Sequence, residues 1–84
     1  MRRARIDSTH VEIRQALRAV GWLVFDCHGL PEWCDLIAYH PARGEVKLIE
    51  AKAPKGKLKP SQAKLVADGW PIVFLRSAEE AAKL

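Results

Sequence analysis

The sequence predicts an α/β domain in which a mixed β-sheet is flanked by helices. Four short segments are rich in β-branched and aromatic residues, which favour strands. Three other segments carry helical periodicity or the residues that begin and end helices. Their order, α-β-β-β-α-β-α, is typical of a sheet with helices packed on it, and 84 residues predict one domain, residues 1–84.

The first element is a helix predicted for residues 8–20. Apolar side chains recur at helical spacing from Ile13 onward. Thr9 followed by Glu12 has the spacing of a capping box at the helix start. Gly21 stands where a helix of this length ends.

Three strands are predicted next, at residues 22–25, 35–39 and 46–52. The loop between the first two contains Gly29 and Pro31, which interrupt regular structure. A short polar turn separates the second strand from the third, so we expect these two strands to form a hairpin.

The C-terminal part is predicted as helix, strand and helix. Pro60 suits the first turn of a helix over residues 61–67, and Gly69 ends it. A strand follows at residues 72–75, and a short helix at residues 78–84 closes the chain.

Composition limits the function classes without choosing one. The net charge of +4 and the pI near 9.4 weakly favour polyanionic partners. Two cysteines make no disulfide framework, and no signal peptide or run of about 20 apolar residues is visible. We therefore expect a cytoplasmic protein with reduced thiols and no membrane segment.

The predicted hairpin brings two acidic residues together. If Tyr39 pairs with Val46 across the turn, Asp35 lies opposite Glu50. Because residues two apart in a strand share a face, Lys52 lies on the same side. Like charges that face each other directly in a sheet destabilise it. The pair therefore needs a compensating positive charge.

A divalent cation would provide that charge. The carboxylates of Asp35 and Glu50 and the main-chain carbonyl of Ala51 are hard oxygen ligands, which suit Mg²⁺ or Mn²⁺. Phosphodiester hydrolysis uses such an ion together with a cation such as Lys52. The alternative is an ion pair between Glu50 and Lys52 at a sheet edge, with no ion and no catalysis.

At this point the chain resembles a known nuclease family. The matching stretches are RIDSTHVEIRQALRAVGW, GLPEWCDLIAY, LIEAKAPKGKLKPSQAKL and RSAEEAAKL, which cover nearly the whole chain. They resemble the virus-type replication–repair nuclease (VRR-NUC) domain of the PD-(D/E)XK superfamily. The resemblance implies a restriction-endonuclease-like fold, divalent-metal dependence and endonuclease action on DNA. Stand-alone members are similar to Holliday-junction resolvases and act as homodimers on branched DNA, as in phage replication and repair.

The resemblance assigns roles to five residues. Asp35, Glu50 and Lys52 match the catalytic motif, and Gln62 matches the glutamine of the following helix. Glu12 matches the acidic residue of the first helix that helps to hold the metal, although a helix-capping role also explains it.

The loop before Asp35 departs from the family pattern. The family has an aspartate directly after the proline, whereas here Glu32 follows Pro31 and Asp35 comes three residues later. Either the loop carries an insertion or Glu32 takes the aspartate's role. We favour Asp35, because a strand follows it directly.

Four lysines near the motif are candidates for phosphate binding. They are Lys55, Lys57, Lys59 and Lys64. The alternative is a solvated basic loop. The N-terminal arginines would add a flexible basic arm.

Other residues are weaker candidates for a site. Cys27, His28, Cys34 and His40 do not have the spacing of a zinc finger. His10 could reach the site from the first helix, but a lone histidine on a helix is more often at the surface. Trp22 and Trp70 are expected in the core or at a dimer interface, and Trp33 is the tryptophan placed to contact DNA.

The sequence therefore predicts a divalent-metal-dependent DNA endonuclease, homodimeric and selective for branched DNA. One alternative is a DNA-binding module that has the fold without catalysis. Another is a small interaction domain without DNA affinity.

Overall fold

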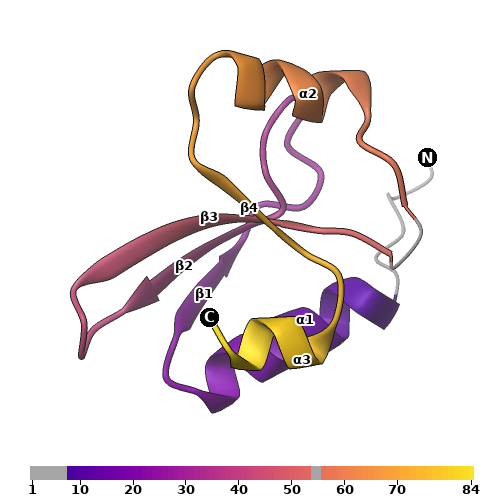
Figure 1. Ribbon diagram of the computed structural model, residues 1–84. Coiled ribbons are helices and arrows are strands. Elements are labelled where there is room, and N and C mark those ends of the chain that lie inside the picture. Colours follow the sequence, from indigo (N-terminus) through magenta and orange to yellow (C-terminus); the bar gives the residue numbers. More distant parts are fainter. Residues whose placement is uncertain (1–7, 54–55) are drawn as a thin grey trace.

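The computed structural model describes residues 8–53 and 56–84, and its element order confirms the predicted α-β-β-β-α-β-α arrangement (Figure 1). The four strands form one mixed sheet in the order β1-β2-β3-β4, with β3 and β4 parallel and the other neighbours antiparallel. The elements are α1 (Ser8–Ala19), β1 (Leu23–Asp26), β2 (Leu36–His40), β3 (Glu45–Ala51), α2 (Pro60–Ala67), β4 (Ile72–Leu75) and α3 (Ala78–Ala82).

Helix α1 begins earlier than the predicted cap. Ser8 is already helical, so Thr9 lies inside the helix and its prediction as N-cap is wrong. The helix buries His10, Ile13 and Leu17, which are three and four residues apart and share one face. Gly21 follows with φ of 99°, and a Cβ added there would lie 2.9 Å from the ring of His40. Glycine is therefore required at this turn.

The hairpin of β2 and β3 has the predicted register. Tyr39 pairs with Val46, and Ile37 pairs with Leu48. Beyond the pair of Leu36 and Ile49, the backbone N–H of Asp35 donates to the carbonyl of Ile49 at 3.0 Å. The pairing thus continues to the site residues.

The hydrophobic core lies between one face of the sheet and the two helices α1 and α3. Figure 1 shows these helices next to each other on that face, and they pack together. The core residues are Ile13, Leu17, Trp22, Leu36, Ala38, Ile49, Leu75 and Ala81. Trp22 precedes β1 and is buried in this core, which is one of the two places predicted for it.

The opposite face of the sheet is only partly covered. Helix α2 lies on that side, while the hairpin of β2 and β3 extends away from it (Figure 1). We call the exposed apolar residues of β1, β2 and β3 on this face the open face. They are Leu23 (62% exposed), Phe25 (66%), Tyr39 (41%) and Val46 (60%). Along each strand these residues alternate with more buried residues, so the two sets lie on opposite faces of the sheet.

The N-terminal turn of helix α2 forms as the sequence predicts. Pro60 occupies the first turn as predicted, and the helix buries Gln62 and Leu65. Trp70, after the helix, is 47% exposed, and its ring meets that of Trp33 edge-on with centroids 5.0 Å apart. Trp70 therefore packs against a loop tryptophan and not inside the core.

Among the described residues, no helix is long and apolar enough to cross a membrane.

Candidate functional site

A cavity of about 370 Å³ opens at the C-terminal end of β3. It collects side chains from α1, from the loops beside β2 and β3, and from α2. Its lining comprises His10, His28, Asp35, Glu50, Ala51, Lys52, Ala53, Gly56, Lys57, Lys59 and Gln62. The four residues predicted to be catalytic, Asp35, Glu50, Lys52 and Gln62, are all present in this lining.

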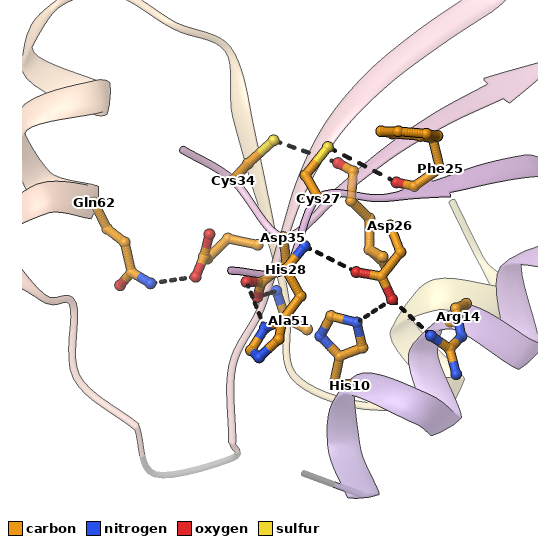
Figure 2. Close-up of polar contacts among 12 residues, drawn as sticks. His10, Arg14, Phe25, Asp26, Cys27, His28, Cys34, Asp35, Ala51 and Gln62 are labelled. Carbon is orange, nitrogen blue, oxygen red and sulfur yellow. Dashed lines mark hydrogen bonds and ion pairs between the residues drawn. The ribbon is translucent and has the colours of Figure 1, made fainter. Parts of the chain in front are cut away.

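Asp35 is fixed by the strand beside it. Its Oδ2 accepts a hydrogen bond from the backbone N–H of Ala51 at 3.0 Å (Figure 2). This bond ties the residue before β2 to the end of β3, directly beside Glu50. The two carboxylates therefore meet as the hairpin register predicts.

Glu50 is an acidic side chain in an unfavourable place. It is 4% exposed, and burial followed by the negative charge of Asp35 raises its pKa to about 7, with Lys52 acting in the opposite direction. Its Oε2 accepts a hydrogen bond from Gln62. Its Oε1 is buried and has no hydrogen-bond partner among the described residues. A buried carboxylate oxygen without a donor is costly unless a ligand provides a positive charge.

Gln62 is oriented by the start of its own helix. Its Oε1 accepts the backbone N–H of Lys59 at 3.0 Å, which occupies the oxygen end of the amide. The NH₂ end therefore faces Glu50. Gln62 is 8% exposed, so this orientation is held in a buried position.

Lys52 is buried at the side of the acidic pair. It is 6% exposed, and its Nζ donates to the carbonyl of Lys57 at 2.5 Å. Arg76 supports the same loop, donating to the carbonyls of Ala53 and Gly56 at 2.9 Å each. These bonds tie Lys52 and Arg76 to the backbone of Ala53, Gly56 and Lys57, which line the cavity.

The predicted phosphate-binding lysines divide into three cases. Lys57 and Lys59 are exposed and line the cavity. Lys64 lies on α2 outside the lining and pairs with Asp68 at 3.2 Å. Lys55 lies outside the described residues.

Two expectations about acidic residues have clear outcomes. Glu12 is exposed on α1 and is not in the cavity lining, so the structure does not bring it to the acidic pair. Glu32 is exposed, with φ of 58°, and also lies outside the lining. Asp35, the favoured alternative, is the loop residue that reaches the cavity.

His10 and His28 line the cavity, so the favoured surface position of His10 is wrong. His10 is 4% exposed and lies beside His28, with ring centroids 5.2 Å apart. Asp26 holds both of them, as Figure 2 shows. The signal for His10 was present in the sequence, because it precedes Ile13 and Leu17 by three and seven residues and so shares their buried face. His28 has no such signal, since its loop follows no periodicity.

The rejected zinc set is not assembled. Among the described residues, the cluster of three or more His, Cys, Asp or Glu side chains that could hold a metal ion is His10, His28 and Asp35. Cys27 and Cys34 are free and buried, and burial raises the pKa of both thiols, that of Cys34 to about 11. His40 lies elsewhere, with its Nε2 within 3.1 Å of the carbonyl of Val20.

The acidic pair is suited to a divalent cation. Burial and the negative charge of Asp35 raise the Glu50 pKa, and Glu50 Oε1 has no partner within the described part of the chain. A positive charge between Glu50 and Asp35 would offset the repulsion and give this oxygen a partner. Comparison with known proteins adds no family: no family model, curated protein or solved structure matches the chain.

Proposed function

We propose that this chain is a divalent-metal-dependent DNA endonuclease that hydrolyses phosphodiester bonds in the cavity at the end of β3. The observation that carries the proposal is the meeting of Asp35 and Glu50 beside the buried amine of Lys52. Two acids and an amine in one small cavity match the needs of phosphodiester hydrolysis, which are a place for a cation and a positive group for the developing charge.

The carboxylates of Asp35 and Glu50 and the main-chain carbonyl of Ala51 are the proposed ligands of Mg²⁺ or Mn²⁺. When bound, such an ion provides a water of lowered pKa and polarises the phosphoryl oxygen. Glu12 is not proposed as a ligand, because it is exposed outside the cavity.

The remaining residues position the substrate and stabilise charge. The positive charge of Lys52 stabilises the negative charge that develops on the phosphoryl oxygens in the transition state. Gln62 holds the Glu50 carboxylate in place through its oriented amide. Lys57 and Lys59, at the rim, bind phosphates of the DNA backbone without reading its sequence.

The active form is proposed to be a homodimer that acts on branched DNA such as four-way junctions. A chain of this size has a small core, and the open face leaves Leu23, Phe25 and Val46 each at least 60% exposed. A second copy would cover this face, and two-fold symmetry would pair two cavities on a two-fold junction.

The test is incubation of the chain with a synthetic four-way junction, a flap and a linear duplex, each with Mg²⁺ and with EDTA. We expect Mg²⁺-dependent cleavage, strongest on the junction. Lys52→Met is expected to lose cleavage about 10²–10³-fold while it still binds DNA. Lys47→Met, which changes a lysine of β3 that does not line the cavity, is the matched control.

Either of two results would refute this proposal and favour another function. DNA binding without cleavage under any metal would favour a non-catalytic DNA-binding module. Absence of DNA binding at modest salt would favour an interaction domain.

A further inference from the structure

A second group of ligands lies on the other side of Asp35. We call His10, His28 and Asp35 the histidine cluster. They come from α1, from the loop after β1 and from the residue before β2, and one ligand atom of each lies within 4.8 Å of the others. All three line the cavity, and His10 is 4% exposed.

Asp26 organises the two histidines. Its Oδ2 lies 3.3 Å from Nε2 of His10 and accepts a 2.7 Å hydrogen bond from Arg14, while its Oδ1 accepts the backbone N–H of His28 at 2.8 Å (Figure 2). One carboxylate therefore fixes the ring of His10 and the backbone of His28. A carboxylate behind a ligating histidine is a common arrangement in protein metal sites, because it sets the tautomer and the orientation of the ring.

His28 supplies an independent observation. Its Nε2 is buried and has no hydrogen-bond partner among the described residues. Its Nδ1 lies 3.8 Å from Oδ1 of Asp35, whereas the other oxygen of Asp35 accepts from Ala51. The imidazole thus has one buried nitrogen, Nε2, without a hydrogen-bond partner in the described part of the chain, while its other nitrogen, Nδ1, faces an oxygen of Asp35.

The chemistry of these ligands differs from that of the acidic pair. Mg²⁺ prefers oxygen ligands throughout, whereas imidazole nitrogen suits Zn²⁺, Co²⁺ and related transition ions. We propose that His10, His28 and Asp35 form a second cation site, selective for a transition ion of the Zn²⁺ or Co²⁺ class, which shares Asp35 with the acidic pair. Binding at this site does not depend on the proposed nuclease activity, although both use Asp35.

The experiment is titration of the metal-free chain with Co²⁺, followed by visible absorption. We expect one equivalent to bind with a spectrum of nitrogen and oxygen ligation, displaced by Zn²⁺ and not by Mg²⁺. His28→Ala is expected to weaken binding at least about tenfold. His10→Asn provides a second variant, and circular dichroism checks the fold of each.

The third histidine gives the matched control. His40→Asn removes an imidazole outside the cavity and is expected to leave Co²⁺ binding unchanged. Equal Co²⁺ affinity of the wild type and His28→Ala would overturn the proposal. So would a thiolate charge-transfer band that disappears in Cys27→Ser, since it would place the ion on a cysteine.

Glu50→Gln separates this site from the proposed nuclease. It is expected to lose Mg²⁺-dependent cleavage and to keep the Co²⁺ spectrum. A chain that cleaves DNA with Mg²⁺ but binds no Co²⁺ would refute the histidine site alone, and a chain that binds Co²⁺ without cleaving DNA would refute the nuclease alone.

Discussion

The side-chain amide of Gln62 donates a hydrogen bond to Glu50 while its oxygen accepts the backbone N–H of Lys59. The start of α2 and the acidic end of β3 are joined through this one side chain. Gln62 is therefore a positioning residue, since it acts on the site through Glu50.

Replacement of Gln62 tests that role. We expect Gln62→Ala to lower cleavage about tenfold and to move the acid limb of the pH–rate profile to higher pH, because a donor to the charged carboxylate holds its pKa down. Gln15→Ala, on the exposed side of α1, is the control. If the pH–rate profile of Gln62→Ala is not shifted, the role of Gln62 is purely structural.

The pKa of Glu50 makes a prediction about stability in the absence of metal. Burial and Asp35 raise this pKa from 4.5 to about 7, so between these values the folded chain binds more protons than the unfolded chain. The free energy of unfolding therefore falls as pH rises through this window. We expect Glu50 to contribute a loss of up to about 3 kcal/mol between about pH 4 and pH 8.

Urea unfolding of wild type and Glu50→Gln across this range measures the effect. The variant lacks the titrating group, so the difference between the two should grow with pH. Glu45→Gln, an exposed change on the same strand, should follow the wild type. A constant difference between wild type and Glu50→Gln would contradict the raised pKa.

The rim lysines make a prediction about salt. Lys57→Ala and Lys59→Ala should each weaken DNA binding and reduce the slope of log K against log salt by about 1, because each removes one phosphate contact. Lys64→Ala should have a smaller effect, since Lys64 pairs with Asp68 outside the cavity. Slopes of Lys57→Ala and Lys59→Ala equal to the wild-type slope would remove the rim lysines from the DNA interface.

The open face makes a prediction about assembly. Phe25→Lys places a charge at the most exposed position of this face, and we expect it to convert dimers to monomers in sedimentation velocity. Val66→Lys, at an exposed position of α2, is the control. A wild-type chain that is monomeric at high concentration would contradict the dimer.

The acidic pair could be predicted from the sequence because strand pairing follows from local features. A short turn fixes Tyr39 opposite Val46, and alternation then carries the register to Asp35 and Glu50 without further information. The position of Gln62 beside Glu50 depends on how α2 packs against the sheet. Strand periodicity does not predict that packing. The family resemblance supplied that residue instead.

The histidines show where sequence reasoning failed. A helix phase assigned from Ile13 and Leu17 already places His10 on the buried face and Glu12 on the exposed one. The general expectation that a lone histidine lies at the helix surface outweighed this phase. His28 depends on a loop whose conformation is set by Asp26 and by packing. Such contacts arise from tertiary structure and leave no periodic signal.

The most direct test of the acidic pair as a cation site is Mg²⁺ binding measured by isothermal titration calorimetry on wild type, Glu50→Gln and Glu45→Gln. Glutamine at position 50 keeps an oxygen to accept the Gln62 hydrogen bond while it removes the charge. We predict that wild type and Glu45→Gln bind Mg²⁺ equally, and that Glu50→Gln binds it at least about tenfold more weakly and no longer cleaves DNA. Unchanged Mg²⁺ affinity in Glu50→Gln would contradict the account.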